Sequence, residues 1–357
     1  MSVDMRTIAA HVGVSRTTVH RALTNTGRIS EDTRRKILQA ARELGYLPND
    51  LARGLRSRRS AVIGYATPGM SPFQASVLAG VEDVADRNGY SILIACSWLN
   101  QEREIRGLDT LREKRVDGII ACPAHPQVNA DYYRRLLDTG PPFVFIDREM
   151  PGVETDCVTT DNYTGGLLAG RHLVSLGRKK MVFGCVPGTE MQATSVTERL
   201  RGFRAALVEA GLPLVAMIGE GRAKRVNLRA HAAVAMAEYL QDGRELDAVF
   251  AVNDGVASGM MCALRRTGLK VPDDVSVVGF DGLEVALHSW PPLTTIKQPT
   301  AQMGREAMRL LLERISVEGA ARSRERIVLT PKLVIAGSCG STEYDPSDLS
   351  FDDHYLP

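Results

Sequence analysis

The strongest constraint on the fold of this chain is a regular alternation of short apolar runs with amphipathic helical stretches, from residue 61 to about residue 340. Strands separated by helices favour parallel sheets, because a parallel pair needs a long crossover connection. About 280 residues exceed one comfortable core, so we expect an α/β body of two lobes. The expected strands span residues 61–66, 91–95, 118–121, 143–146, 181–186, 248–252 and 275–279.

The first sixty residues predict a separate unit of three helices. Helical apolar spacing from Met5 to Val12 ends at Gly13, a residue that tolerates the positive φ of a tight turn. Ser15 follows as an N-cap for the next helix, and a third helix over 31–44 would close the unit. A helix, a glycine turn and a capped helix within about twenty residues are the pattern of a helix-turn-helix.

Charge is distributed unevenly along the chain. Residues 1–60 contain 12 Lys and Arg against 5 Asp and Glu, whereas the remainder contains 32 against 37. A basic head on a mildly acidic body suits a polyanionic partner. On the second helix, Arg16, Thr17, His20 and Arg21 fall away from the apolar stripe. Arginine can donate two hydrogen bonds to guanine, and threonine can contact a thymine methyl. Alternatively, these side chains form an ordinary solvated helix face.

Residues 47–60 predict a short and conditional helix. Asn49 can cap about two turns that place Leu51 and Leu55 on one side. Such a helix is too short to be stable alone, and Gly54 weakens it by about 1 kcal/mol relative to alanine. We expect it to order when two copies meet in a widened minor groove, with Leu55 between base pairs. A flexible linker is the alternative, which the arm by itself favours.

These motifs resemble those of the lac repressor (LacI) family, and the resemblance covers nearly the whole chain. The family opens with a pattern close to D-V-A-x-x-A-G-V-S-x-x-T-V-S-R, which this chain carries with three departures. Thr7, Val12 and His20 stand where the family has Asp, Ala and Ser, and the last exchange could make DNA affinity depend on pH. The family's hinge elements G-Y-x-P-N and A-x-x-L match residues 45–49 and 52–55.

The resemblance implies which residues contact DNA. Arg16 and Thr17 occupy the two main base-reading positions, and Leu55 is the minor-groove wedge. The expected DNA-binding residues are Ser15, Arg16, Thr17, Thr18, His20, Arg21, Asn49, Ala52, Arg53, Leu55 and Arg56.

Polar residues follow several of the expected strands. Asp147-Arg148, Asn253-Asp254 and Asp281 each come directly after such a strand or close to its end, and residues 294–299 form a crossover between lobes. Each of these residues alone is an ordinary loop or capping residue. Ligands of doubly wound sheets, however, bind near the carboxyl ends of the strands.

The resemblance implies a body of the periplasmic-binding-protein type. Two doubly wound parallel sheets would be crossed three times by the chain, with an effector cleft between them. Carboxylates and amides can clamp adjacent hydroxyls there, and an aromatic ring can pack on a sugar face. The expected effector-binding residues are Phe73, Gln74, Asp147, Arg148, Ser195, Arg199, Arg222, Asn253, Asp281 and Gln298.

Arg222 replaces the aromatic residue that many family members carry at about this position. Together with Arg148 and Arg199 it would make the cleft cationic. This gives the hypothesis of an anionic effector, such as a sugar acid or a phosphorylated sugar. The alternative is that residues 222–225 form an exposed basic loop, and the sequence slightly favours it.

Other classes of protein find little support. The chain has no G-x-G-x-x-G after a strand, no G-x-x-x-x-G-K-[ST], no H-E-x-x-H and no G-x-S-x-G. Its six cysteines lie far apart without a C-x-x-C pair, so we expect no metal and no cofactor. A charged leader and a long apolar span are both lacking, which favours the cytoplasm and argues against a membrane partner.

The expected architecture is an all-α three-helix helix-turn-helix headpiece with a hinge helix, joined to an α/β two-lobe periplasmic-binding-protein-like core. Its expected domains are 1–46 for DNA binding, 47–60 for the hinge, 61–340 for effector binding and dimerisation, and 341–357 as a flexible acidic tail. No tetramerisation heptad occurs in that tail, which favours a homodimer.

The expected function is that of a transcription regulator, a repressor by family default. A sugar or sugar derivative bound between the lobes would control its affinity for double-stranded operator DNA. One alternative is a solute-binding protein of the transport type without DNA function. Another is an α/β enzyme that acts on a sugar or nucleotide.

Overall fold

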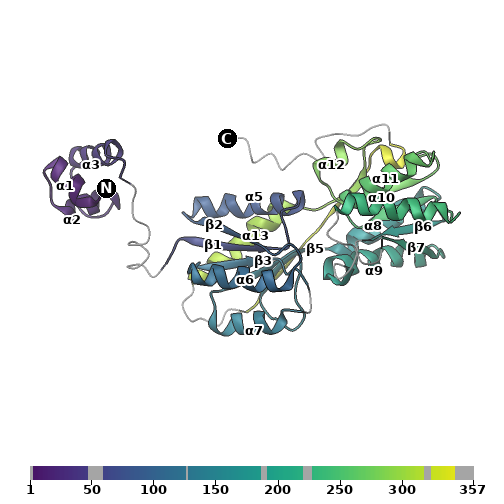
Figure 1. Cartoon of the computed structure of the whole chain (residues 1–357), viewed down its shortest axis with the longest axis horizontal. Coiled ribbons are helices and arrows are strands. Elements are labelled where there is room, and N and C mark those ends of the chain that lie inside the picture. The colour runs from purple at the N-terminus through teal and green to yellow at the C-terminus, as the bar shows by residue number, and fades with distance from the viewer. Residues whose placement is uncertain are drawn as a thin grey trace. The chain divides into compact units, whose positions relative to one another are not determined.

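The computed structural model describes residues 3–46, 59–125, 128–185, 191–219, 227–316 and 323–341. The chain divides into two compact units, Met1–Ser60 and Ala61–Pro357, which are described separately (Figure 1).

The N-terminal unit contains the three expected helices, α1 (Met5–Val12), α2 (Arg16–Leu23) and α3 (Glu31–Glu43). Each begins at a capping side chain: Asp4 accepts from two backbone N–H groups at 2.9 Å, Ser15 from Thr18 N at 3.1 Å, and Ser30 from Thr33 N at 3.2 Å. Such caps satisfy N–H groups that a helix start leaves without partners. The apolar stripes of the helices meet in one small core around Ile8, Val19 and Ile37.

The body begins with a sheet in the strand order β11-β5-β4-β3-β1-β2, all neighbours of which are parallel. Helices α5 and α13 cover one face of this sheet, and α6 and α7 cover the other (Figure 1). The strands are β1 (Val62–Thr67), β2 (Ser91–Cys96), β3 (Gly118–Ala121), β4 (Phe143–Ile146), β5 (Asp156–Thr160) and β11 (Arg326–Leu329). The helices are α5 (Pro72–Arg87), α6 (Gln101–Glu113), α7 (Ala130–Thr139) and α13 (Thr300–Ser316).

The second lobe contains a sheet in the order β12-β10-β9-β8-β6-β7, where only β12 is antiparallel among the described strand pairs. Its strands are β6 (Met181–Gly184), β7 (Leu214–Ile218), β8 (Ala248–Ala251), β9 (Ser276–Asp281), β10 (Thr294–Lys297) and β12 (Lys332–Val334). Its helices are α8 (Asn162–Ser175), α9 (Thr194–Glu209), α10 (Leu228–Gln241), α11 (Asp254–Arg266) and α12 (Glu284–Leu287), followed by a short turn of 3₁₀ helix over Gly337–Cys339.

Within the described residues, the chain passes between the two lobes three times. It crosses from β5 to α8, from β10 to α13 and from β11 to β12. The expectation of two lobes with parallel sheets and three crossings is therefore confirmed. The segment 294–299, expected as a crossover, first forms β10 and then passes into α13.

Some strand limits differ from the sequence expectation. The strand expected at 275–279 begins at Ser276 and continues to Asp281, so Asp281 ends the strand instead of following it. The strand expected at 181–186 ends at Gly184. Strands β5, β7, β11 and β12 are absent from the expectation. β5, β11 and β12 are short segments that mix polar and apolar residues without a clear period, whereas β7 is a short apolar run that the sequence analysis did not pick out. No helix among the described residues is long and apolar enough to cross a membrane.

Candidate DNA-reading helix and effector site

Helix α2 presents a polar face away from the small core. Arg16, Thr17 and Arg21 are exposed, whereas Val19 is fully buried. Ser15 and Thr18 have a local structural role, because their hydroxyl groups lie 2.9 Å apart and Ser15 caps the helix. The structure therefore leaves the first exposed turn of α2 available for base edges, which is how a recognition helix enters the major groove.

Part of the predicted site lies outside the described residues. This applies to the hinge positions Asn49, Ala52, Arg53, Leu55 and Arg56. It applies equally to Arg222 in the body.

In the body, the polar residues predicted from loops come together where the carboxyl ends of strands from both lobes meet. Asp147 follows β4 with φ 64°, and Asp281 ends β9 with φ 111°. A positive φ is unfavourable for a residue with a side chain, so the surrounding contacts must hold both positions. Asp147 is 6 % exposed and Asp281 8 %, so both carboxylates are buried.

Arg199 on α9 lies at the centre of this cluster. Its Nε donates to Asn162 Oδ1 at 2.8 Å, and its Nη1 donates to the Val252 carbonyl at 2.8 Å. Nη1 also lies 3.7 Å from Asp281 Oδ1, and the guanidinium carbon lies 3.7 Å from the centre of the Phe280 ring. These contacts within the protein fix the guanidinium, which lowers the entropic cost of using it in binding.

Close packing of α8 against α9 places Arg199 there. A Cβ at Gly166 would lie 2.0 Å from the Arg199 carbonyl oxygen, and a Cβ at Gly202 would lie 2.0 Å from the Tyr163 carbonyl oxygen. Only glycine allows two helix backbones to approach this closely. This close packing brings Asn162, at the start of α8, within hydrogen-bond distance of Arg199.

Gln298 links Asp281 to the chain crossing that leads to α13. Its Nε2 donates to Asp281 Oδ1 at 2.8 Å, and its backbone N–H donates to the Asp281 carbonyl at 3.1 Å. Gln298 is 2 % exposed, and its Oε1 has no hydrogen-bond partner among the described residues. Burial raises the pKa of Asp281 to about 7, opposed by the positive charge of Arg199 and by the Gln298 hydrogen bond.

The first lobe supplies a second set of buried polar contacts. The Tyr65 hydroxyl donates to Gln74 Oε1 at 2.7 Å, and Gln74 Nε2 lies 3.6 Å from Cys122 Sγ. That thiol lies 3.8 Å from Asp147 Oδ2, which also lies 3.4 Å from Arg148 Nε. These contacts connect β1, α5 and the segments that follow β3 and β4, near the carboxyl ends of the strands of the first sheet.

The other predicted effector-binding residues, Ser195, Asn253 and Phe73, differ in their contacts. Ser195 is buried near the start of α9. Asn253 Oδ1 caps α11 by accepting from Val256 N at 2.8 Å, which leaves its amide N–H groups for other partners. Phe73 is 8 % exposed and packs in the hydrophobic core between α5, α13 and the first sheet.

The charged groups that the two lobes contribute to the cluster interact electrostatically. Asp147 and Arg148 of the first lobe both influence the ionisation of Arg199 and Asp281 of the second lobe. Sequence reasoning predicted these four residues. It missed Asn162, the first residue of α8, and Tyr65, which lies within the apolar strand β1. Within the described part of the chain, no group of His, Cys, Asp and Glu side chains could hold a metal ion.

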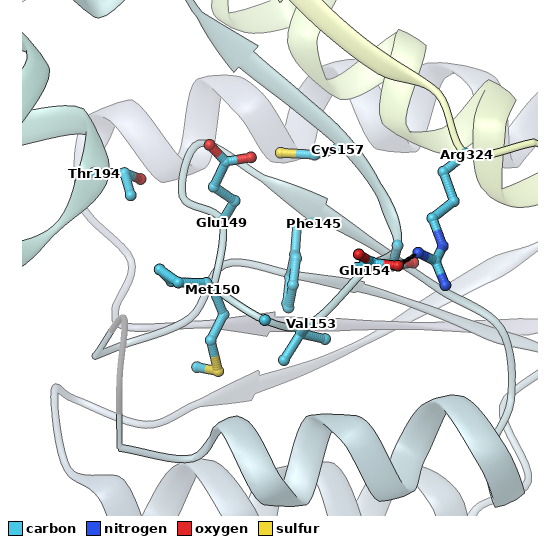
Figure 2. Close-up of a pocket in the computed structure, with 11 residues that line it drawn as sticks. Phe145, Glu149, Met150, Val153, Glu154, Cys157, Thr194 and Arg324 are labelled. Carbon is cyan, nitrogen blue, oxygen red and sulfur yellow. Dashed lines mark hydrogen bonds and ion pairs between the residues drawn. The ribbon is translucent and has the colours of Figure 1, made fainter.

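A cavity of about 520 Å³ lies beside this cluster, between the loop after β4 and the start of α9 (Figure 2). Glu149 and Thr194, which line it, directly follow and precede Arg148 and Ser195 in the sequence. Figure 2 shows Phe145 in the middle of the lining and the paired Arg324 and Glu154 at one side. The sequence alone did not predict this cavity, because its lining comes from segments about 180 residues apart.

Comparison with known proteins places both units in one family. Residues 4–49 match the family model described as bacterial regulatory proteins, lacI family, and residues 171–339 match a periplasmic binding protein-like domain. The chain is 34 % identical over 342 residues to the HTH-type transcriptional regulator DegA of Bacillus subtilis, covering 95 % of this chain and 98 % of DegA. It is 32 % identical to the HTH-type transcriptional repressor PurR of Photobacterium profundum, covering 94 % of this chain and 98 % of that repressor.

Solved structures show the same likeness. A lac repressor dimer bound to operator and the anti-inducer ONPF has a TM-score of 0.82 and 26 % identity, over 95 % of this chain and 99 % of that chain. The complex of the transcriptional regulator CelR with cellobiose has a TM-score of 0.69 and 30 % identity, and the match covers 94 % of this chain and 99 % of the CelR chain. The chain belongs to the lacI family of bacterial regulatory proteins, transcription regulators in which a DNA-binding helix-turn-helix is joined to a periplasmic-binding-protein-like effector domain.

Proposed function

We propose that this protein is a homodimeric, sequence-specific transcription repressor whose affinity for operator DNA is controlled by a small molecule bound between its two lobes. The observation that carries the proposal is the buried polar cluster of Asp147, Arg148, Arg199, Asp281 and Gln298, contributed by both lobes of a chain that also has a recognition helix. A ligand that contacts both lobes changes their relative angle, because it stabilises the arrangement in which all its contacts are made.

The DNA-reading part of the proposal rests on α2 and on charge. Arg16 and Thr17 are exposed in the first turn of a capped helix, and residues 1–60 carry a net charge of +7. Arginine reads guanine through two parallel hydrogen bonds, and the remaining basic residues neutralise phosphates. In a dimer, two such helices would enter successive major grooves about one helical turn apart.

The charges of the cluster favour an uncharged ligand with several hydroxyl groups. Among the described residues, Asp147 lies 3.4 Å from Arg148 and Asp281 lies 3.7 Å from Arg199, so carboxylates already balance part of the positive charge that an anion would need. A hydroxyl group can donate to a carboxylate or to an amide oxygen and accept from a guanidinium at the same time. We therefore propose a neutral sugar, and the anionic alternative depends on Arg222.

The proposed regulation connects this cleft to the hinge. A change in lobe angle would alter the separation of the two chains near Ser60, and so the free energy of ordering residues 49–56 on DNA. The site of action would be the cytoplasm, where the operator is. We assign no catalytic step to the protein, since its named relatives are transcription regulators.

Two measurements test the proposal. Fluorescence anisotropy with DNA from upstream of the protein's own gene should give specific binding that weakens steeply as salt rises from about 50 to 200 mM, as counterion release requires. Arg16→Ala is the matched variant for base reading. A purified protein that prefers no duplex sequence would overturn the regulator in favour of the solute-binding alternative.

The effector class is tested by thermal shift of the full chain with D-ribose, D-glucose, cellobiose and D-gluconate. Binding to the folded state alone raises Tm, by an amount that grows with ligand concentration over Kd. We expect a neutral sugar to stabilise the protein and to change its affinity for DNA. Stabilisation by D-gluconate alone would show that the ligand is an anion.

A further inference from the structure

The function proposed above uses the carboxylate of Asp281 but does not explain how that residue is held. Asp281 has φ 111°, a region of backbone conformation that side-chain-bearing residues rarely adopt. Such strain persists where neighbouring contacts over-determine it. The contacts on its own side chain, from Gln298 and Arg199, orient the carboxylate but do not set the backbone angle.

The Asp281 carbonyl accepts from Gln298 N at 3.1 Å, and a further constraint on the residues that follow comes from Asp254, the first residue of α11. Its carboxylate accepts from Leu283 N at 2.8 Å and also from the N–H of Gly282, so it binds the two residues that follow Asp281. The Thr295 hydroxyl donates to the other oxygen, Oδ1, at 2.5 Å. Asp254 is completely buried. Its three hydrogen bonds therefore tie the start of α11 to the turn after β9 and to β10.

Two glycines make room for this arrangement. A Cβ at Gly279 would lie 2.3 Å from Asp254 Oδ1, and a Cβ at Gly282 would lie 2.6 Å from the Cα of Lys297. Gly282 also has φ 72°, which favours glycine. Gly279 therefore leaves room for the Asp254 carboxyl group, and Gly282 leaves room for the neighbouring strand β10.

We propose that Asp254 is a positioning residue of the effector site, which holds Asp281 at its positive φ by binding the next two backbone N–H groups, and so aims the Asp281 carboxylate at Arg199 and Gln298. The expected effect of Asp254 on ligand affinity rests on the proposed effector function, whereas its effect on the conformation of Asp281 does not. Asp254 itself touches no ligand in this role.

The role depends on the shape and hydrogen bonds of Asp254, and it needs no negative charge. Burial raises the pKa of Asp254 well above its ordinary value, and the nearby Asp281 carboxylate raises it further. In the protonated acid, Oδ2 still accepts from Leu283 N, while an O–H on Oδ1 can donate to Thr295. Asparagine reproduces this pattern with its oxygen and its N–H₂ group.

The test compares Asp254→Asn, Asp254→Ala and the control Asp242→Ala, which removes an exposed carboxylate paired with Arg244. Crystal structures of the full-length variants should show Asp281 at positive φ in D254N and at negative φ in D254A. In D254A, Arg199 Nη1 and Asp281 Oδ1 should lie farther apart than 3.7 Å. A positive φ retained in D254A would overturn the proposal.

The functional arm uses the same four compounds, D-ribose, D-glucose, cellobiose and D-gluconate. D254A should lose about tenfold or more in affinity for whichever compound stabilises the wild type, whereas D254N and D242A should bind within about twofold of it. DNA binding without these compounds should be unchanged in all three variants.

The outcomes separate the positioning role from the proposed function. If D254A does not fold, D254N decides, because a role based on charge predicts that D254N loses binding as D254A does. If the wild type binds neither DNA nor any of the compounds, the proposed function is wrong, and the Asp281 conformation in the variant crystals still decides the role of Asp254.

Discussion

Replacing Gly202 with alanine tests whether close approach of α8 and α9 builds the effector site. The new Cβ would lie 2.0 Å from the Tyr163 carbonyl oxygen and 2.8 Å from Leu167 N, whereas ordinary contacts of this kind begin near 3.4 Å. Both obstructing atoms belong to the backbone, so no side chain can rotate away. The two helices must move apart by about an ångström or more, which also separates Arg199 from Asn162.

The magnitude follows from two opposing terms. Alanine gains about 1 kcal/mol over glycine in a helix interior. Overpacking of a well-packed interior typically costs about 1–3 kcal/mol and more where the backbone has to shift. Because the obstructing atoms are backbone, the overpacking cost should lie at or above the upper end of that range, about 3 kcal/mol, so the net loss in free energy of unfolding should be about 2 kcal/mol or more. Effector affinity should fall as well, because Arg199 loses its fixed position.

The assay is urea unfolding of the full-length protein followed by circular dichroism, at one fixed protein concentration because a dimer's stability depends on concentration. The matched control is Gly255→Ala in α11, whose Cβ would meet only Asn253 Oδ1 at 3.4 Å. The control should be as stable as the wild type or up to about 1 kcal/mol more stable. If Gly202→Ala were as stable as this control, the helices would have room to spare, and the steric account of the site would be refuted.

Three further predictions follow from the site. Arg16→Ala should reduce specific DNA binding by about 1–3 kcal/mol and relax selectivity at one base pair, so an equal loss on a scrambled duplex in the anisotropy assay would contradict base reading. Leu55→Ala should weaken specific binding far more than non-specific binding in the same assay, and parallel losses would show that the wedge assignment is wrong. Asp281 has a folded pKa of about 7 against an ordinary 3.8, so the folded state holds a proton that the unfolded chain releases between those values. The penalty for burying its carboxylate is therefore absent below about pH 4 and grows as pH rises to about 7, so Tm should fall between about pH 4 and 7 and level off at higher pH. Asp281→Asn should flatten that slope, and a slope unchanged by the substitution would assign it to other groups.

Local features of this protein were predictable from its sequence. The caps Ser15 and Ser30, the glycine turn at Gly13 and the apolar stripes of three helices depend on contacts three or four residues apart, which a short stretch of sequence specifies completely. The alternation of strands and helices predicted parallel sheets, because parallel neighbours need a long connection such as a helix. The motifs also indicated which loops carry polar residues at strand ends.

The effector site was decided by tertiary structure. Asp147 and Asp281 lie 134 positions apart in the sequence, and the order of strands in two sheets is what brings them together. Their positive φ angles have no sequence signal, because neither residue is glycine. Asp254 reads as an ordinary helix-start residue, and its grip on Gly282 and Leu283 exists only once β9 packs beside α11. The physical reason is that hydrogen bonds within one turn follow from neighbouring residues, whereas those between distant segments form only after the hydrophobic cores have fixed which strands are adjacent.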